Sequence, residues 1–434
     1  MPQPARRKQI FIGSADLRLA VVSPFVDRSH GTERALAELV ERLAHRYGCQ
    51  IHLFSQRVKG VSLDAAPSGF SAEIGAVIWH KVPSFPGPHV AQFLAWLVLN
   101  AFVRTSKRFF RDCSFDLLLS PGINTLHADL VIVHALFHRL QELSREKHQD
   151  VWVKPRLLRD LHRRLYYALL TQLERRVYSD RRVSLAAVSE RTAALLVRYF
   201  RRSDVRVIPN GVDTTQFSPY VRLERRESAR ARRNIRDSDL VLLLIGNDWQ
   251  NKGLHTILKA MAACSDLPFR LLIVGSDASE CFYEHARSLG VYERCRWEPP
   301  RADVMDLYAA AEVYVSPSRE DAFALPPLEA MACGLPVITS VHNGGSRIIT
   351  EGLDGFIVTD PDDSVALAVL LRRLAQQPDL RSRVGENAAR TAQQYTWDRN
   401  AAAVWELVQE VHARKNSTST TEQAQRMARS AGVK

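Results

Sequence analysis

Three carboxylates stand in the largely apolar segment PSREDAFALPPLEAMACGLPVITS, residues 317–340. Glu320 and Asp321 precede its two prolines, and Glu329 follows them in a run that predicts a helix ending at Gly334. A strand before this loop and a helix after it place N–H groups where negative charge, such as a phosphate, is stabilised. Carboxylates in such a loop can accept hydrogen bonds from the hydroxyls of a sugar or a ribose. The alternative is a turn aspartate and a solvated helix glutamate.

The chain has 434 residues, 46% of them apolar, and a net charge of +12. Its length predicts two or three domains, and the basic excess favours an anionic partner: nucleic acid, an acidic membrane surface or a phosphorylated substrate. Six scattered cysteines without metal-type spacing indicate reduced thiols in a cytoplasmic protein. The start lacks the order of a signal peptide, and the longest apolar run, residues 90–103, is too short to span a bilayer.

Apolar strand patterns alternate with helical patterns along the chain, which predicts parallel α/β sheets. The expected strands of a first set are 17–25, 51–55, 115–122, 128–135, 184–189 and 205–211. The pattern restarts at residues 239–248, after an arginine-rich polar stretch. The predicted parts are an α/β domain at 1–205, a second at 206–395, a final helix at 396–414 and a disordered polar tail at 415–434.

The acidic segment resembles the signature of the retaining family 4 glycosyltransferases, in which two glutamates are separated by seven residues. Asp321 aligns with the first glutamate and Glu329 with the second, and Ala324 replaces a common glycine. The resemblance implies that Asp321 contacts hydroxyls of the donor hexose and that Glu329 binds the ribose of the donor nucleotide. Glu320 is the alternative first acid if the loop is shifted.

The resemblance extends over most of the chain and implies the GT-B fold, two Rossmann-like domains facing across a cleft. IPNGVDTTQF, residues 208–217, is similar to the family's interdomain segment. GNDWQNKG, residues 246–253, resembles a loop of lipopolysaccharide-core glycosyltransferases of this family. The resemblance implies that Lys252 neutralises the donor diphosphate, although Asn247 occupies the place of a frequent arginine.

Two further segments resemble parts of the family's site. Gly31 lies at the turn from the first strand to its helix, where the family has a glycine loop. His134 resembles the strand-end histidine that many members place beside the reacting sugar, and His127 is its rival. The catalytic residues implied are His134 and Asp321. The donor-binding residues implied are Gly31, Gly246, Asn247, Lys252, Ala324, Leu325 and Glu329.

The implied reaction transfers a hexose from a nucleotide-diphosphate sugar to a hydroxyl of a glycan or glycolipid acceptor, with retention, in cell-envelope or polysaccharide synthesis. Lys252 and loop N–H groups would stabilise the leaving diphosphate. We expect no metal and no cofactor besides this donor substrate. The alternatives are an inactive or regulatory nucleotide-sugar-binding relative, or another GT-B enzyme such as a phosphorylase or an epimerase.

Two basic, aromatic-rich stretches, residues 93–111 and 154–182, are typical of helices that bind anionic lipid surfaces. They fit core-facing helices with a solvated basic face equally well. We expect a cytoplasmic protein, with peripheral binding to the inner face of the cytoplasmic membrane as an option. Nucleic acid is not an expected partner, because the chain lacks a Walker loop, a helix-turn-helix pattern and an RNA motif.

Overall fold

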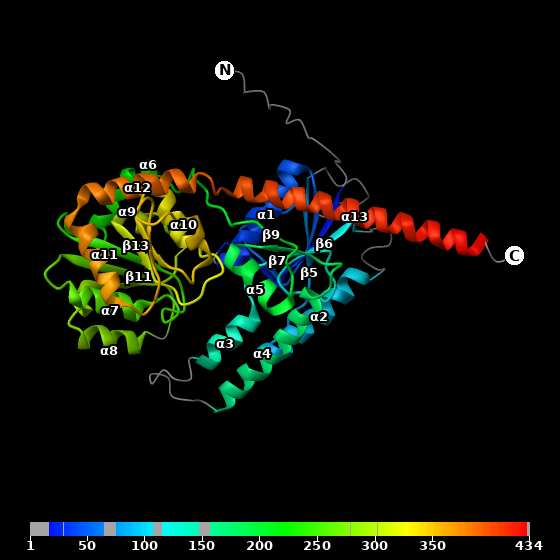
Figure 1. Cartoon of the computed structure of the whole chain (residues 1–434), viewed down its shortest axis with the longest axis horizontal. Coiled ribbons are helices and arrows are strands. Elements are labelled where there is room, and N and C mark those ends of the chain that lie inside the picture. Colours follow the sequence, from blue (N-terminus) through cyan, green and yellow to red (C-terminus); the bar gives the residue numbers. More distant parts are fainter. Residues whose placement is uncertain are drawn as a thin grey trace, which may run out of the picture. The chain divides into compact units, whose positions relative to one another are not determined.

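A computed structural model describes most of the chain, shown in Figure 1. The described residues are 17–28, 30–64, 75–106, 115–146, 157–277, 279–301 and 303–431. Parts of the two basic stretches, 107–111 and 154–156, lie outside these residues.

The first sheet has seven strands in the order β5-β3-β1-β6-β7-β8-β9, and β1 pairs in parallel with both β3 and β6. Its strands are β1 Arg18–Val22, β3 Gln50–Ser55, β5 Val77–Lys81, β6 Leu117–Pro121, β7 Leu130–Val133, β8 Ser184–Ala187 and β9 Val205–Val207. A separate pair joins β2 (Phe25–Val26) to β4 (Arg57–Val58). The helices of this part are α1 Gly31–Tyr47, α2 His89–Thr105, α3 Phe137–Glu146, α4 Leu157–Tyr178 and α5 Glu190–Phe200.

The second sheet has six strands in the order β12-β11-β10-β13-β14-β15, with every pair parallel. Its strands are β10 Leu240–Ile245, β11 Phe269–Val274, β12 Cys295–Glu298, β13 Val313–Ser316, β14 Val337–Ser340 and β15 Phe356–Val358. Its helices are α6 Pro219–Ala231, α7 Leu254–Ala263, α8 Glu280–Ser288, α9 Met305–Ala310, α10 Leu325–Ala332, α11 Ser364–Gln376 and α12 Pro378–Ala392. Figure 1 shows α7 and α8 on one side of β11 and α6 and α12 on the other. Helices on both faces explain the continuous apolar run of β10, LVLLLI, because neither face meets water.

The direction in which this sheet grows reverses between β10 and β13. The chain first adds β11 and β12 on one side of β10, and then returns to add β13, β14 and β15 on the other side. Leu242 and Leu243 of β10 pair with Val313 and Tyr314 of β13. The loops that leave the carboxyl ends of these two strands therefore diverge to opposite faces, which is where open α/β sheets bind ligands.

Contacts divide the chain into two compact units. The first comprises residues 1–132, 165–185 and 401–434, and the second comprises 133–164 and 186–400. The second unit therefore contains α3 and α5 in addition to the six-stranded sheet, although both helices precede the boundary that the sequence suggests at residue 205.

The last helix, α13, runs from Trp397 to Ala431. In the first unit, Trp405 of this helix stacks on Tyr47 at 5.3 Å between ring centroids, and Lys415 pairs with Asp129 at 3.0 Å. The helix continues through most of residues 415–434, which the sequence predicts to be a disordered tail. That segment lacks apolar periodicity but has no proline or glycine before Gly432, so helix propensity is not interrupted there.

Buried charges join α6 to the second sheet. Nη1 of Arg230 lies 3.0 Å from Oε1 of Glu312, and both residues are buried. The backbone N–H of Val241 in β10 donates to the same carboxylate at 2.6 Å, and Arg226 also pairs with it. The arginine-rich stretch is therefore part of the folded second unit, where its charges are matched by carboxylates.

We expect Glu312→Ala to lower the free energy of unfolding by about 3–5 kcal/mol, because it leaves a buried guanidinium unpaired. Denaturant unfolding measures the change. The matched control is Glu386→Ala, which removes an exposed partner of Arg390 and should cost less than about 1 kcal/mol. Equal losses in the two variants would contradict a structural role for the buried pair.

Candidate functional site

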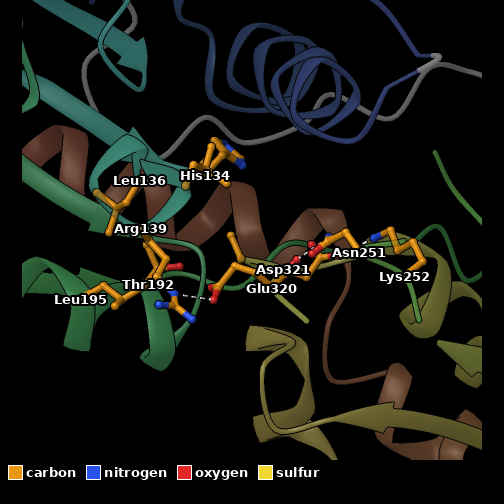
Figure 2. Close-up of a pocket in the computed structure, with 12 residues that line it drawn as sticks. His134, Leu136, Arg139, Thr192, Leu195, Asn251, Lys252, Glu320 and Asp321 are labelled. Carbon is orange, nitrogen blue, oxygen red and sulfur yellow. Dashed lines mark hydrogen bonds and ion pairs between the residues drawn. The ribbon is translucent and has the colours of Figure 1, made fainter. Parts of the chain in front are cut away.

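A cavity of about 260 Å³ lies at the carboxyl ends of β10 and β13, and all of its lining residues belong to the second unit. Figure 2 shows how these side chains lie. The lining residues are His134, Ala135, Leu136, Arg139, Leu140, Thr192, Leu195, Asn251, Lys252, Glu320, Asp321 and Ala322. Three of the residues singled out in the sequence, His134, Lys252 and Asp321, are thus brought to one cavity, together with the alternative acid Glu320.

Lys252 and Asp321 form an ion pair at this cavity. The ammonium nitrogen of Lys252 donates to Oδ2 of Asp321, and each side chain is less than one-fifth exposed. Lys252 comes from the loop after β10 and Asp321 from the loop after β13, so the pair joins the two loops at the point where the sheet reverses. A cation and an acceptor carboxylate therefore stand side by side at the position that the fold offers to a ligand.

Two glycines in the loop after β10 make this approach possible. Gly253 has a φ of +78°, and a Cβ there would lie 2.5 Å from the carbonyl oxygen of Pro317 in the acidic loop. Gly246 has a φ of +143°, and a Cβ there would lie 3.0 Å from Cε of Lys252. Both positions adopt backbone angles that favour glycine, and Gly253 lets the two loops pack directly against each other.

Glu320 is held by two arginines that the sequence did not single out. Nε of Arg139 donates to its carboxylate at 2.9 Å, and Arg191 donates from Nε at 3.1 Å and from Nη2 at 2.6 Å. Figure 2 shows the contact of Arg139 with Glu320 as a dashed line. Arg139 belongs to α3 and Arg191 to α5, so they lie 181 and 129 residues from Glu320 in sequence. No local pattern signals contacts over such separations.

Asn251, the residue before Lys252, also went unnoticed in the sequence. Its side-chain amide donates to the carbonyl oxygen of Glu320 at 2.8 Å, and its own carbonyl accepts from the N–H of Arg319 at 2.8 Å. The two loops therefore exchange a pair of hydrogen bonds in addition to the ion pair. The acidic loop also bonds to the segment after β14, where the carbonyl of His342 accepts from the N–H of Asp321 at 3.1 Å.

Glu329 does not line the cavity. It lies in α10, is 3% exposed, and accepts a hydrogen bond of 2.6 Å from the hydroxyl of Tyr308. Burial raises the pKa of Tyr308 well above its usual value, and the nearby carboxylate of Glu329 raises it further. The phenol therefore stays protonated and donates. A carboxylate can accept further hydrogen bonds, so the predicted ribose contact remains a prediction that the buried position does not test.

The start of α10 offers fewer backbone donors than an ordinary helix. Ala324 is its N-cap and Leu325 its first residue, and both are nearly buried. Pro326 and Pro327 follow, and proline has no N–H. The N–H of Ala324 lies 3.4 Å from the side-chain oxygen of Asn343. In this loop the capacity to stabilise an anion rests more on the Lys252 ammonium than on the helix start.

His134 follows directly after β7, is partly buried and lines the cavity. Burial lowers the pKa of its imidazole from 6.5 to about 4. The ring is therefore neutral near pH 7 and can donate one hydrogen bond and accept another. Its rival His127 is exposed and belongs to the first unit.

Of the predicted donor-binding residues, only Lys252 lines the cavity. The others lie outside its lining: Gly31, Gly246, Asn247, Ala324, Leu325 and Glu329. Gly31 is the first residue of α1 in the first unit, and a Cβ there would meet no heavy atom within 4 Å. Asn247 is exposed, and its side-chain oxygen accepts from the N–H of Ser276 at 2.9 Å. Asn247 thus joins the loop after β10 to the loop after β11. Their roles in donor binding remain predictions.

No cluster of three or more His, Cys, Asp or Glu side chains that could hold a metal ion is present among the described residues. Hydrogen-bonding groups for a phosphate or a sugar, by contrast, are present at the cavity. The Lys252 ammonium can donate, the Asp321 carboxylate can accept, and the ring of His134 can do both. The described site can therefore bind an anion at Lys252 and the hydroxyl groups of a ligand at Asp321. The neutral imidazole of His134 lies at the same cavity.

Comparison with protein families divides the chain in two. Residues 225–391 match the family model described as Glycosyl transferases group 1, and residues 29–216 match the one described as Glycosyltransferase Family 4. The chain belongs to the family 4 glycosyltransferases. The resemblance drawn from the acidic segment is thereby confirmed, and the first family model contains both Lys252 and Asp321.

Solved structures confirm that this family 4 chain has the predicted GT-B fold. WaaG, a glycosyltransferase involved in lipopolysaccharide biosynthesis, gives a TM-score of 0.71 at 20% identity, covering 90% of this chain and 99% of WaaG. A sucrose-phosphate synthase from Thermosynechococcus elongatus gives 0.71 at 21% identity, covering 92% and 100%. Anabaena HepE in complex with UDP-glucose gives 0.65 at 17% identity, covering 91% and 100%.

Curated relatives of this family 4 chain include D-inositol 3-phosphate glycosyltransferases. The protein of Corynebacterium urealyticum is 31% identical over 218 residues, which is 48% of this chain and 51% of the relative. That of Streptomyces bingchenggensis is 32% identical over 244 residues, 52% of each. The chain therefore spans about half the length of the curated relatives that it matches.

The lowered pKa of His134 predicts a pH dependence of stability. As pH falls from 6.5 towards 4, the unfolded chain takes up a proton at this residue that the folded protein does not, so the free energy of unfolding falls. His134→Gln should reduce that fall, measured as the difference in stability between pH 7.5 and pH 5. An NMR titration of the imidazole provides the direct check, and a pKa near 6.5 for His134 would refute the prediction.

Proposed function

We propose that this protein is a retaining glycosyltransferase that transfers a hexose from a nucleotide-diphosphate sugar to a hydroxyl of a glycan or glycolipid. The observation that carries the proposal is the pair of Lys252 and Asp321 at the sheet's point of reversal. The names of the fold relatives support the substrate class: HepE was solved with UDP-glucose, and WaaG acts in lipopolysaccharide biosynthesis. A role in cell-envelope or polysaccharide synthesis is proposed on the same basis.

The proposed mechanism uses the same residues in stated roles. The diphosphate would bind at Lys252, whose ammonium stabilises the negative charge that develops on the leaving group. Binding of the diphosphate would compete with Asp321 for that ammonium, and Asp321 would then accept hydrogen bonds from hexose hydroxyls. The acceptor hydroxyl would attack the anomeric carbon from the face on which its bond to the diphosphate breaks, and the hydroxyl proton would pass to the departing diphosphate. The neutral ring of His134 would lie beside the reacting sugar.

The first test is Lys252→Ala, with Lys259→Ala as the matched control on an exposed position of α7. Thermal shifts with UDP-, GDP- and ADP-sugars first identify the donor, because a ligand that binds the native state raises its stability. Sugar transfer is then measured with that donor. We expect Lys252→Ala to lower kcat by about 10²–10³-fold and Lys259→Ala to have no effect. Unchanged turnover in the Lys252 variant would refute the assignment.

The same assay separates the alternatives. An inactive nucleotide-sugar-binding relative would show a thermal shift without transfer or donor hydrolysis. A phosphorylase would require inorganic phosphate, and an epimerase would convert the donor without an acceptor. Proton NMR of the product reports whether the anomeric configuration of the donor is retained, and inversion would contradict the proposed mechanism.

We also propose that the first unit binds an anionic membrane surface through α2. Leu94, Val98 and Phe102 are 45%, 68% and 64% exposed and recur every four residues, so they form one apolar stripe on the helix. The opposite side is anchored by Trp96, which is buried and donates to the carbonyl of Asn124 at 2.9 Å. Helix α4 packs beside α2 through Phe93 and Tyr166.

Helix α4 also has an exposed apolar side chain, Leu165, which is 61% exposed. None of the helices in the described ranges is long and apolar enough to cross a membrane. An exposed apolar stripe on a chain with a net charge of +12 suits a helix that lies in the interface of an anionic bilayer.

Sedimentation with vesicles tests this surface. The wild type should sediment with phosphatidylglycerol vesicles at low salt, less so at high salt, and not with pure phosphatidylcholine. Val98→Glu combined with Phe102→Glu should weaken binding by about tenfold or more, because two apolar side chains leave the interface. Leu223→Glu, at an exposed position of α6, is the control. Equal binding of the α2 variant and the wild type would reject the proposal.

A further inference from the structure

Two neighbouring acids, Glu320 and Asp321, line the cavity, and the sequence leaves open which of them contacts the donor sugar. Their partners differ. The Glu320 carboxylate is 10% exposed and accepts three hydrogen bonds from the guanidinium groups of Arg139 and Arg191. The Asp321 carboxylate is 18% exposed and pairs with the ammonium of Lys252. The two acids are therefore held by groups of different kinds.

The difference in partners determines which acid a ligand can release. An incoming diphosphate brings negative charge to Lys252, so it can replace Asp321 there and leave that carboxylate available to hydroxyl groups. A ligand that withdrew Glu320 from its partners would leave two partly buried guanidinium groups without their carboxylate, so Glu320 is not released in this way. Withdrawing one member of a buried, hydrogen-bonded ion pair is costly, and multiple guanidinium hydrogen bonds also fix the geometry of the carboxylate.

The arginines connect the acidic loop to the elements beside His134. Arg139 lies five residues after His134, in the helix that follows the same strand, β7. Arg191 lies in the first turn of α5, which is capped by Ser189. Through Glu320, the loop that carries Asp321 is thus tied to the segment that carries His134, and both residues line one cavity.

We infer that Glu320 is a positioning residue: its ion pairs with Arg139 and Arg191 fix Asp321 relative to His134, and it does not itself contact the donor sugar. The inference rests on the proposed function and adds that the two adjacent acids have different roles: Asp321 contacts the sugar and Glu320 positions the loop. Asn251 also positions the acidic loop, since its hydrogen bonds hold the backbone of Glu320 and Arg319 beside Lys252.

The test compares Glu320→Gln with Asp321→Asn. Calorimetry gives the dissociation constants of the nucleoside diphosphate and of its sugar, with the nucleotide chosen by the thermal-shift panel. The dissociation constant of the nucleoside diphosphate divided by that of the nucleotide sugar measures how much the sugar adds to binding. We expect Asp321→Asn to reduce that ratio about tenfold, as for a lost charged hydrogen bond, and Glu320→Gln to leave it unchanged. Glu320→Gln should lower kcat by about 10–100-fold, the scale expected for a small misplacement.

A second set of variants separates positioning from mere stability. Arg139→Ala combined with Arg191→Ala should lower kcat as Glu320→Gln does, and adding Glu320→Gln should lower it no further. Arg225→Ala is the control, because Arg225 is a partly exposed arginine of α6 that pairs with Asp303 and does not line the cavity. A reduced sugar ratio in Glu320→Gln would show that Glu320 binds the sugar. Wild-type kcat in the double arginine variant would overturn the positioning role.

A measurement without donor keeps this inference distinct from the proposed function. Hydrogen exchange at the amides of Arg319 and Asp321 should be faster in Glu320→Gln and in the double arginine variant than in wild type and Arg225→Ala. If no nucleotide binds the wild type, the proposed function fails, whereas the exchange rates still report whether Glu320 holds the loop. Unchanged exchange in both variants would refute the inference directly.

Discussion

The candidate site depends on one constraint, the close packing of two loops that leave neighbouring strands in opposite directions. Because the sheet reverses its order between β10 and β13, nothing in the sheet separates the loops at their carboxyl ends. Gly253 lets the first loop lie against Pro317 of the second. With the backbones in contact, the side chains of Lys252 and Asp321 meet without long reach, and the cavity opens where they meet.

Charge is nearly balanced around this cavity before any ligand is present. Arg139, Arg191 and Lys252 supply three positive charges, and Glu320 and Asp321 supply two negative ones. The balance explains how so many ionic side chains can be less than one-quarter exposed without a large desolvation cost. It also means that a ligand anion has to compete with a resident carboxylate, which for Lys252 is that of Asp321.

The sequence predicted the parts of this arrangement that local patterns encode. Apolar runs ending in glycine located β10 and the loop carrying Lys252, and the spacing of acids located Asp321. Arg139 and Arg191 escaped notice because their contact with Glu320 is made by folding over more than a hundred residues. The burial of Glu329 depends on Tyr308, 21 residues away on another helix, and a periodic pattern cannot reveal which side chain will cover a helix face.

The segments that form the second unit determine how it could be exchanged between relatives. Its chain is discontinuous: residues 133–164 are contributed before the first unit is complete, and residues 186–400 follow. A chimera that joined halves of two relatives at residue 206 would take the acidic loop from one parent and Arg139 and Arg191 from the other. Exchange of the whole second unit between relatives thus requires four junctions rather than one. A single graft would separate Glu320 from the two arginines that bind it.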